Sequence, residues 1–279
     1  MKPDSSRPMD HIERAHLVEP GDASHVIHRY PAAPEFEGLL QRFWIPVWSV
    51  PPGREAPQRV LQYPVALLVV AGDYARFYGV VSGLSTTTLT GEGWAVGVMC
   101  APAAGALVAG GPMSGYTDRY VDVAEVLGAE GERLATRVRA AMARDAHDPE
   151  AHAAAMAAFG DALRPFLPVD DDGRLVNEVV AFVEGDREVV RVAQVCERFG
   201  LAERALQRLV HRRLGLTPKW LIQRRRLQEA AERLRGKPAS IGEVAAVLGY
   251  ADQAHFTRDF ARVTTMTPGQ FAGRHARGS

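Results

Sequence analysis

The sequence predicts an α+β protein, with a cupin-like β-barrel and flanking helices in its N-terminal part and an all-α C-terminal part. Three observations support this prediction. Short β-branched and aromatic runs alternate with Gly and Pro turn signals over roughly residues 26–123. A pattern of two short helices around a Gly turn occurs twice near the C-terminus. The two halves carry opposite net charge, and 279 residues suffice for two ordinary domains.

The N-terminal part begins with a polar segment, residues 1–24, which is rich in Asp, Ser and Pro and is predicted to be disordered or loosely ordered. Residues 25–170 are predicted to form a β-rich regulatory domain. Its strands are expected at 42–48, 60–70, 74–81, 85–90 and 94–100. Strands this short and this regularly separated by turns are typical of an all-β barrel. Two alanine-rich segments, 123–144 and 149–166, are predicted to be helices.

A domain boundary is expected where Pro165, Pro168 and the Asp-Asp-Asp-Gly run at 170–173 interrupt the pattern. The second domain is therefore predicted to span 173–279. It holds 19 Lys and Arg against 11 Asp and Glu, a net charge of +8. The whole chain has 33 Lys and Arg and 33 Asp and Glu, so the rest of the chain holds 14 basic and 22 acidic residues, a net charge of −8. Such polarity favours a polyanionic partner for the basic half.

The repeat in this basic half has matching positions about fifty residues apart. The segment VCERFG at 195–200 corresponds to VAAVLG at 244–249, LQR at 206–208 to FTR at 256–258, and Thr-Pro at 217–218 to Thr-Pro at 267–268. Each copy is typical of a helix-turn-helix, whose second helix lies in the major groove of DNA. The second helices are expected at about 202–214 and 253–263.

Helical periodicity separates the two faces of these second helices. In the first, Arg204, Gln207, Arg208 and His211 share one face, and leucine and valine side chains share the opposite one. In the second, Ala254, His255 and Arg258 lie together, while two phenylalanines point inward. Arg bonds guanine O6 and N7, Gln bonds adenine N6 and N7, and Ala contacts the thymine methyl group. The polar faces are therefore predicted to read bases.

The basic half resembles the AraC/XylS family of bacterial transcription regulators over roughly residues 175–271. The most specific matches are LQRL at 206–209, GLTPK at 215–219, RLQEA at 226–230, AAVLGY at 245–250 and HFTRDF at 255–260. The resemblance implies a sequence-specific regulator whose rigid helix, here 217–235, joins two units that meet successive major grooves. It implies base-reading roles for Arg204, Gln207, Arg208, Gln253, Ala254, His255 and Arg258. Two departures, Ala202 for a capping Ser and Thr265 for a Gly, bear on local stability.

In the N-terminal part, WAVGVMCAP at 94–102, Gly111-Pro112 and TDR at 117–119 resemble an uncharacterised sensor-type domain that precedes this DNA-binding unit in some regulators. Ligand contacts are predicted for Trp44, Tyr78 and Trp94. Further candidates are Trp48, Tyr63, Met99 and Cys100. Residues of these types also form ordinary β-cores, and this alternative stays open.

The expected partners are double-stranded promoter or operator DNA, a small-molecule effector, RNA polymerase if the protein is an activator, and a second copy in a homodimer. No membrane partner, cofactor, metal site or catalytic residue is expected, and the protein is predicted not to be an enzyme. Two cysteines fit a reducing cytoplasm, with association to the bacterial nucleoid. An alternative is an enzyme or thiol sensor, through Cys100, fused to a DNA-binding module, although a cupin oxygenase needs histidine ligands and residues 42–120 contain none.

Overall fold

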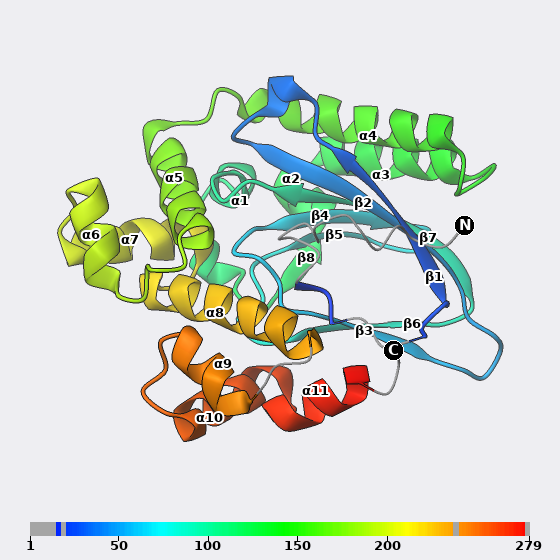
Figure 1. Cartoon of the computed structure of the whole chain (residues 1–279). Coiled ribbons are helices and arrows are strands. Elements are labelled where there is room, and N and C mark those ends of the chain that lie inside the picture. Colours follow the sequence, from blue (N-terminus) through cyan, green and yellow to red (C-terminus); the bar gives the residue numbers. More distant parts are fainter. Residues whose placement is uncertain (1–14, 18–20, 237–239, 277–279) are drawn as a thin grey trace.

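The computed structural model describes residues 15–17, 21–236 and 240–276, and it places a sheet-rich N-terminal half against a helical C-terminal half (Figure 1). The main sheet has six antiparallel strands in the order β1-β2-β7-β4-β5-β8. These strands are β1 (His25–Pro31), β2 (Leu40–Ser49), β7 (Glu92–Cys100), β4 (Leu67–Ala71), β5 (Ala75–Tyr78) and β8 (Tyr120–Asp122). Strands β3 (Ala56–Val60) and β6 (Ser85–Leu89) pair antiparallel as a separate two-stranded ribbon. The predicted combination of a β-rich half and a helical half is confirmed.

The two faces of the main sheet follow from the alternation of side chains along each strand. On β2, Phe43 and Ile45 are buried in the core that also contains side chains of α3 (Ala129–Met142) and α4 (Pro149–Leu163). Figure 1 shows these two helices side by side along one side of the sheet. The short helices α1 (Ala104–Val108) and α2 (Val123–Leu127) complete this layer.

The opposite face carries a second cluster, in which Val60 of the ribbon packs with Leu67 and Val69 of the main sheet. Trp44 and Trp48 belong to this cluster because they alternate with Phe43 and Ile45 along β2. The predicted barrel is thus built from two sheets with an apolar cluster between them. In the part of the chain that the structure describes, β1 and β8 are the edges of the larger sheet.

The helical half contains seven helices within the described residues. They are α5 (Asp171–Gly185), α6 (Val192–Phe199), α7 (Glu203–Leu214), α8 (Pro218–Arg235), α9 (Ile241–Val247), α10 (Gln253–Thr264) and α11 (Pro268–Ala276). Gly200, with φ +64°, and Gly249, with φ +71°, make the turn of each helix-turn-helix. A left-handed backbone at these points suits glycine because it lacks Cβ. Both copies of the sequence repeat therefore fold as predicted.

The predicted start of the second domain, residue 173, is the third residue of a helix. Helix α5 begins at Asp171, and the Asp170 carboxylate caps it by accepting a hydrogen bond of 2.9 Å from the Gly173 amide. Asp170 also forms an ion pair with buried Arg213 of α7. The acidic run acts as a helix N-terminus, where negative charge is favourable, rather than as a linker.

The N-terminal segment also differs from its prediction as loose chain. Ala15 and Leu17 are buried, at 2% and 4% exposure. The Leu17 amide donates to the Arg59 carbonyl at 2.8 Å, and the Leu61 amide donates to the Ala15 carbonyl at 2.7 Å. The apolar side chains of Ala15 and Leu17 explain this packing beside β3, while 1–14 and 18–20 of the same segment lie outside the described residues. No helix in the described ranges is long and apolar enough to cross a membrane.

Candidate nucleic-acid interface

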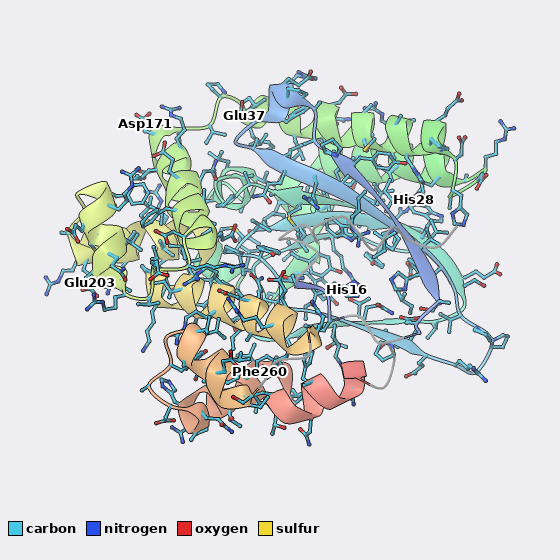
Figure 2. The ribbon with its side chains drawn as sticks, in the orientation of Figure 1. His16, His28, Glu37, Asp171, Glu203 and Phe260 are labelled. Atoms are coloured by element: carbon cyan, nitrogen blue, oxygen red, sulfur yellow. The ribbon has the colours of Figure 1, made fainter. Side chains whose placement is uncertain are left out.

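The second helix of the first unit, α7, has one buried face and one exposed face. Leu206 and Val210 are fully buried, and they hold the helix against α5 and α6. The predicted base readers Arg204, Gln207 and Arg208 are exposed on the other side. Figure 2 shows Glu203, at the start of α7, at the outer edge of the helical half. The sequence therefore presents three polar side chains together on an accessible helix surface.

The second helix of the second unit, α10, repeats this arrangement. The Asp252 carboxylate caps it by accepting a hydrogen bond of 2.6 Å from the His255 amide. Phe256 and Phe260 are fully buried in the core of the unit. The exposed surface of α10 carries the predicted readers Gln253, Ala254, His255 and Arg258.

Carboxylates already engage some of these readers. The Gln207 amide donates to Glu203 at 3.0 Å one turn earlier, and His255 Nε2 lies 3.8 Å from Asp259 Oδ2. Asp259 also accepts a hydrogen bond of 3.1 Å from Gln223 of α8. Glu203 and Asp259 therefore lie next to two of the predicted base readers.

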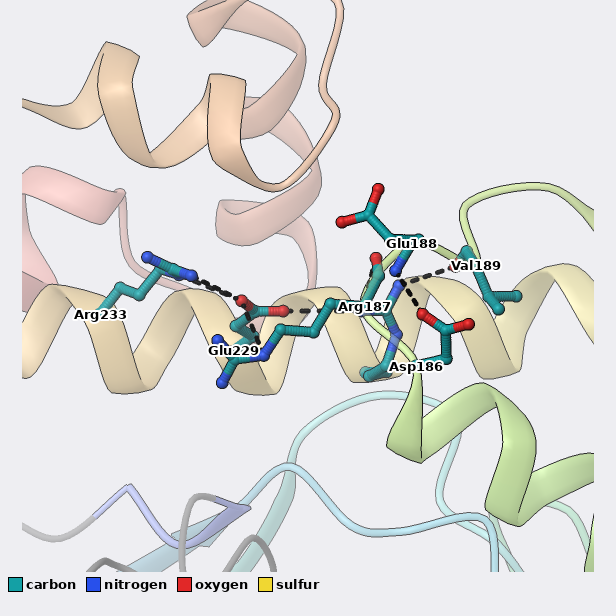
Figure 3. Close-up of polar contacts among 7 residues, drawn as sticks. Asp186, Arg187, Glu188, Val189, Glu229 and Arg233 are labelled. Carbon is teal, nitrogen blue, oxygen red and sulfur yellow. Dashed lines mark hydrogen bonds and ion pairs between the residues drawn. The ribbon is translucent and has the colours of Figure 1, made fainter.

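Helix α8 joins the two units and buries an unusual number of charged groups. Glu229 is only 5% exposed, and Arg187, Arg225 and Arg233 surround it at 3.5, 3.6 and 2.9 Å (Figure 3). A buried carboxylate needs such partners because desolvation of an unpaired charge is costly. The sequence analysis missed this network. The available signal was that charged and amide side chains occur all round α8 rather than on one face.

These α8 side chains fix the helix to both units. Arg225 Nη2 donates to the Val189 carbonyl at 2.7 Å, in the loop between α5 and α6. The neighbouring Arg226 guanidinium stacks over the Tyr250 ring of the second unit at 3.8 Å from its centroid. Burial raises the pKa of Tyr250 to about 12. The two second helices are thereby held in one relative orientation.

Comparison with known proteins matches both halves of the chain to families. Residues 195–274 match the model of a helix-turn-helix domain, and residues 28–122 match a domain of unknown function (DUF6597). The probable transcription factor PqrA of Proteus vulgaris is 31% identical over 100 residues, which cover 35% of this chain and 82% of PqrA. The chain belongs to the AraC/XylS family. It is a DNA-binding transcription regulator.

Other relatives match only their DNA-binding part. The transcriptional activator RhaS of Salmonella arizonae is 35% identical over 100 residues, which cover 36% of each chain. The match with RhaS thus spans about a third of its length. The crystal structure of ToxT from Vibrio cholerae O395 aligns over 91% of this chain and 98% of ToxT at 12% identity, and its TM-score of 0.39 is too low to support an argument.

The predicted ligand residues of this AraC/XylS regulator do not all lie together. Trp44 and Tyr78 belong to the cluster between the main sheet and the ribbon, whereas Trp94 packs on the opposite face with the helices. The structure therefore does not bring these three side chains together on one face of the sheet. The physical reason is register, since Trp94 alternates with Gly93 and Ala95 along β7, and its neighbours point to the ribbon side.

Glycines on β7 make room for the tryptophans of β2. A Cβ atom at Gly97 would lie 2.3 Å from the Trp44 ring, and one at Gly93 would lie 2.4 Å from the Trp48 ring. Both indoles therefore lie flat against the strand. Tyr63 and Met99, two further candidates from the sequence, belong to the same cluster.

The thiol that motivated the sensor alternative is inaccessible. Cys100 is fully buried on the helix side of the sheet, and burial raises the pKa of its thiol to about 12. A thiol with this pKa forms little of the reactive thiolate at neutral pH. Within the described ranges, no three His, Cys, Asp or Glu side chains are grouped so as to hold a metal ion.

Proposed function

We propose that this regulator binds operator DNA with α7 and α10 in successive major grooves, and that its N-terminal half adjusts this binding in response to a small molecule. The observation that carries the proposal is the pair of exposed polar helix faces, each backed by a buried core and both fixed to α8. The proposed base readers are Arg204, Gln207, Arg208, Gln253, Ala254, His255 and Arg258.

Reading by the first unit requires a change of partner. Gln207 releases Glu203 to reach an adenine, whereas the exposed side chains of Arg204 and Arg208 reach guanine directly. The Glu203 carboxylate repels phosphate and therefore favours base contacts at the start of α7 over tight backbone contacts. We expect the strongest sequence preference at the positions that Arg208 and Arg258 meet.

The proposed effector site is the aromatic cluster between the main sheet and the ribbon. Trp44, Trp48 and Tyr78 are only partly buried there, so part of each ring is open to an apolar ligand. A mostly apolar ligand fits these surfaces. It changes DNA affinity only if it binds the DNA-competent and incompetent states unequally.

The remaining assignments rest on the relatives. The name of RhaS supports an activator, which would contact RNA polymerase, and PqrA supports a transcription factor rather than an enzyme. We propose that the protein works in the bacterial cytoplasm, with a homodimer as the form that occupies a repeated operator. The thiol-sensor alternative is not favoured, because Cys100 is buried and its thiol has a raised pKa.

The first test removes one arginine from each recognition helix of the full-length chain. Arg208→Ala and Arg258→Ala should each relax preference at different base pairs, about one helical turn apart. Each should cost roughly 1–3 kcal/mol at its own position if the contact is bidentate. Selection of bound duplexes from a random pool, followed by affinity measurements on single-base variants, gives the positions and the losses.

The matched control is Arg133→Ala, because Arg133 is an exposed arginine on α3 that pairs with Glu130, far along the chain from both units. This variant should bind the selected duplex as the natural chain does. Equal losses across all duplex variants would assign Arg208 and Arg258 to phosphates, and effects confined to one set of base pairs would contradict two reading helices.

A further inference from the structure

The ribbon, whose Val60 packs in the aromatic cluster, is attached at one end to α8 of the DNA-binding half. Its strands pair with each other from Ala56 and Leu89 at one end to Val60 and Ser85 at the other. The chain segments next to this second end, residue 61 after β3 and residues 81–83 before β6, are both hydrogen-bonded to α8. We call these two segments the anchor. Figure 1 shows the ribbon beside the C-terminal part of α8.

Arg224 makes the larger part of the anchor. Its side chain is 3% exposed, and Nη2 donates to the carbonyls of Ser82 at 2.6 Å and Gly83 at 2.9 Å. The Trp220 indole donates to the same Ser82 carbonyl at 3.0 Å, and the Arg224 guanidinium stacks over its ring. All of the carbonyl contacts of this buried guanidinium are made by Nη2, so its position relative to residues 82 and 83 is closely defined.

The other segment of the anchor, Leu61 after β3, is held through Gln228 of α8. Its amide donates to the Leu61 carbonyl at 2.7 Å, and both residues are buried. The side chains of Leu61 and Leu84 also enter the core of the second unit, beside Leu227 of α8. The anchor therefore joins each ribbon strand to the helix that carries both recognition units.

The ribbon is a separate two-stranded sheet. In the described residues its strands pair with each other and, through His16, with the N-terminal segment, but not with the six-stranded sheet. A two-stranded ribbon is only marginally stable by itself, so its position depends on what it packs against. On one side it packs against the aromatic cluster, and at its anchor it packs against α8.

We propose that the ribbon is the mechanical link between the two halves: the occupancy of the aromatic cluster sets the ribbon position, and the anchor on Arg224 and Gln228 transmits that position to α8. This inference rests on the proposed function, and it names the route of its regulation. Coupling between sites is reciprocal, so binding of DNA at α7 and α10 must alter the ribbon. The link is therefore testable with DNA alone.

The experiment measures amide hydrogen exchange of the full-length chain with and without a duplex selected from a random-sequence pool. Exchange reports the local opening equilibrium of each segment. In the natural chain, saturating duplex should change exchange in peptides from 56–61 and 81–89 by about fivefold or more. In the Arg224→Lys/Gln228→Leu double variant, which keeps the charge and approximate volume, the duplex should still bind but this change should disappear.

Two comparisons keep the result interpretable. Arg226→Lys alters a neighbouring arginine of α8 that stacks on Tyr250 instead, and it should retain the DNA-linked change in the ribbon. Unchanged exchange in β7 shows that the double variant is folded. If the double variant does not fold, the single variant Gln228→Leu is measured in its place. Ribbon exchange that ignores DNA in the natural chain, or a DNA-linked change that persists in the double variant, overturns the link. Absence of duplex binding by fluorescence anisotropy overturns the proposed function and the link together.

Discussion

At the residue scale, exposed and buried polar groups differ in how well the sequence predicts them. The exposed readers Arg208 and Arg258 follow from helical periodicity, because the apolar face of each helix fixes the opposite face. Buried Arg224 and Glu229 do not, because Arg224 donates to carbonyls that are distant in sequence and Glu229 also pairs with the distant Arg187. Burial lowers the pKa of Arg224 to about 10, which still leaves it charged at neutral pH.

Glu184 on α5 is a half-buried acid whose ionisation affects stability. Burial raises its pKa to about 7, above the value of about 4.3 for an unfolded chain. The native state therefore holds a proton that the unfolded state has lost between these two values. Stability from this group is complete below about pH 4 and is lost as the pH rises through 7.

We expect Glu184→Gln, which stays neutral, to raise the free energy of unfolding at pH 8 by an amount on the order of 2 kcal/mol, and to change it little at pH 4. Urea unfolding at the two pH values measures the difference. Glu178→Gln alters an exposed acid of the same helix and serves as the control. An equal effect of Glu184→Gln at both pH values would show that the carboxyl is not desolvated in the native state.

At the scale of elements, helices were easier to predict than strands. Both recognition helices begin and end within one residue of their predicted bounds. The expected strand at 60–70 is instead the end of β3, an irregular buried stretch containing Pro64, and β4. The sequence from 60 to 70 predicts a single strand because apolar side chains continue through the irregular residues between β3 and β4. Nothing local marks which sheet each part joins.

The two recognition helices also differ at their ends. Helix α10 has Thr265 at its C-cap with φ +62°, a conformation that a β-branched residue adopts rarely, whereas α7 ends at Gly215. Helix α7 has Ala202 at its N-cap with no side-chain hydrogen bond, whereas Asp252 caps α10. Relative to the family pattern, α7 therefore lacks a capping side chain at its N-terminus, and α10 lacks a glycine at its C-cap.

The missing N-cap is the easier of these to restore. Ala202 has φ −63° and ψ 144°, the extended backbone of an N-cap residue, so a Ser hydroxyl there can accept a hydrogen bond from the first turn. We expect Ala202→Ser to raise the free energy of unfolding by roughly 0.5–1 kcal/mol. Thermal unfolding of the two proteins measures it, with Ala202→Val as a control that adds volume without an acceptor. A midpoint that is unchanged or lower in the Ser variant would show that this amide does not need a cap.

At the scale of the whole molecule, the halves are more closely joined than composition and charge indicate. One core cluster contains side chains of the main sheet, α3 and α4 together with those of α5 to α8. The Thr117 hydroxyl donates to the Gly215 carbonyl at 3.0 Å, and a Cβ atom at Gly215 would lie 2.2 Å from that hydroxyl oxygen. Periodicity shows that a helix has an apolar face, but it cannot show which distant surface covers that face.

The shared core changes how the basic half should be isolated. A fragment that starts at residue 173 lacks Asp170, which caps α5 and pairs with Arg213. Residues 169–279 keep both interactions, and this is the fragment we expect to bind duplex DNA by itself. Its thermal midpoint should lie below that of the full chain, because Gly215 and its neighbours lose their cover from Met113 and Thr117.

The basic charge of this half dictates how its DNA binding responds to salt. Residues 169–279 hold 19 Lys and Arg against 14 Asp and Glu, a net charge of +5. The fragment neutralises phosphates and releases their counterions, so its affinity should fall at least about a hundredfold between about 50 and 200 mM salt. The full-length chain should show the same slope on a logarithmic plot, because its acidic half makes no phosphate contacts. Fluorescence anisotropy over a salt series measures both slopes. The control for binding at the recognition helices is the fragment with the triple substitution Arg204→Ala/Arg208→Ala/Arg258→Ala. A fragment that is helical by circular dichroism yet fails to bind at low salt would place DNA recognition outside these units, and a steeper slope for the full-length chain would place phosphate contacts in the N-terminal half.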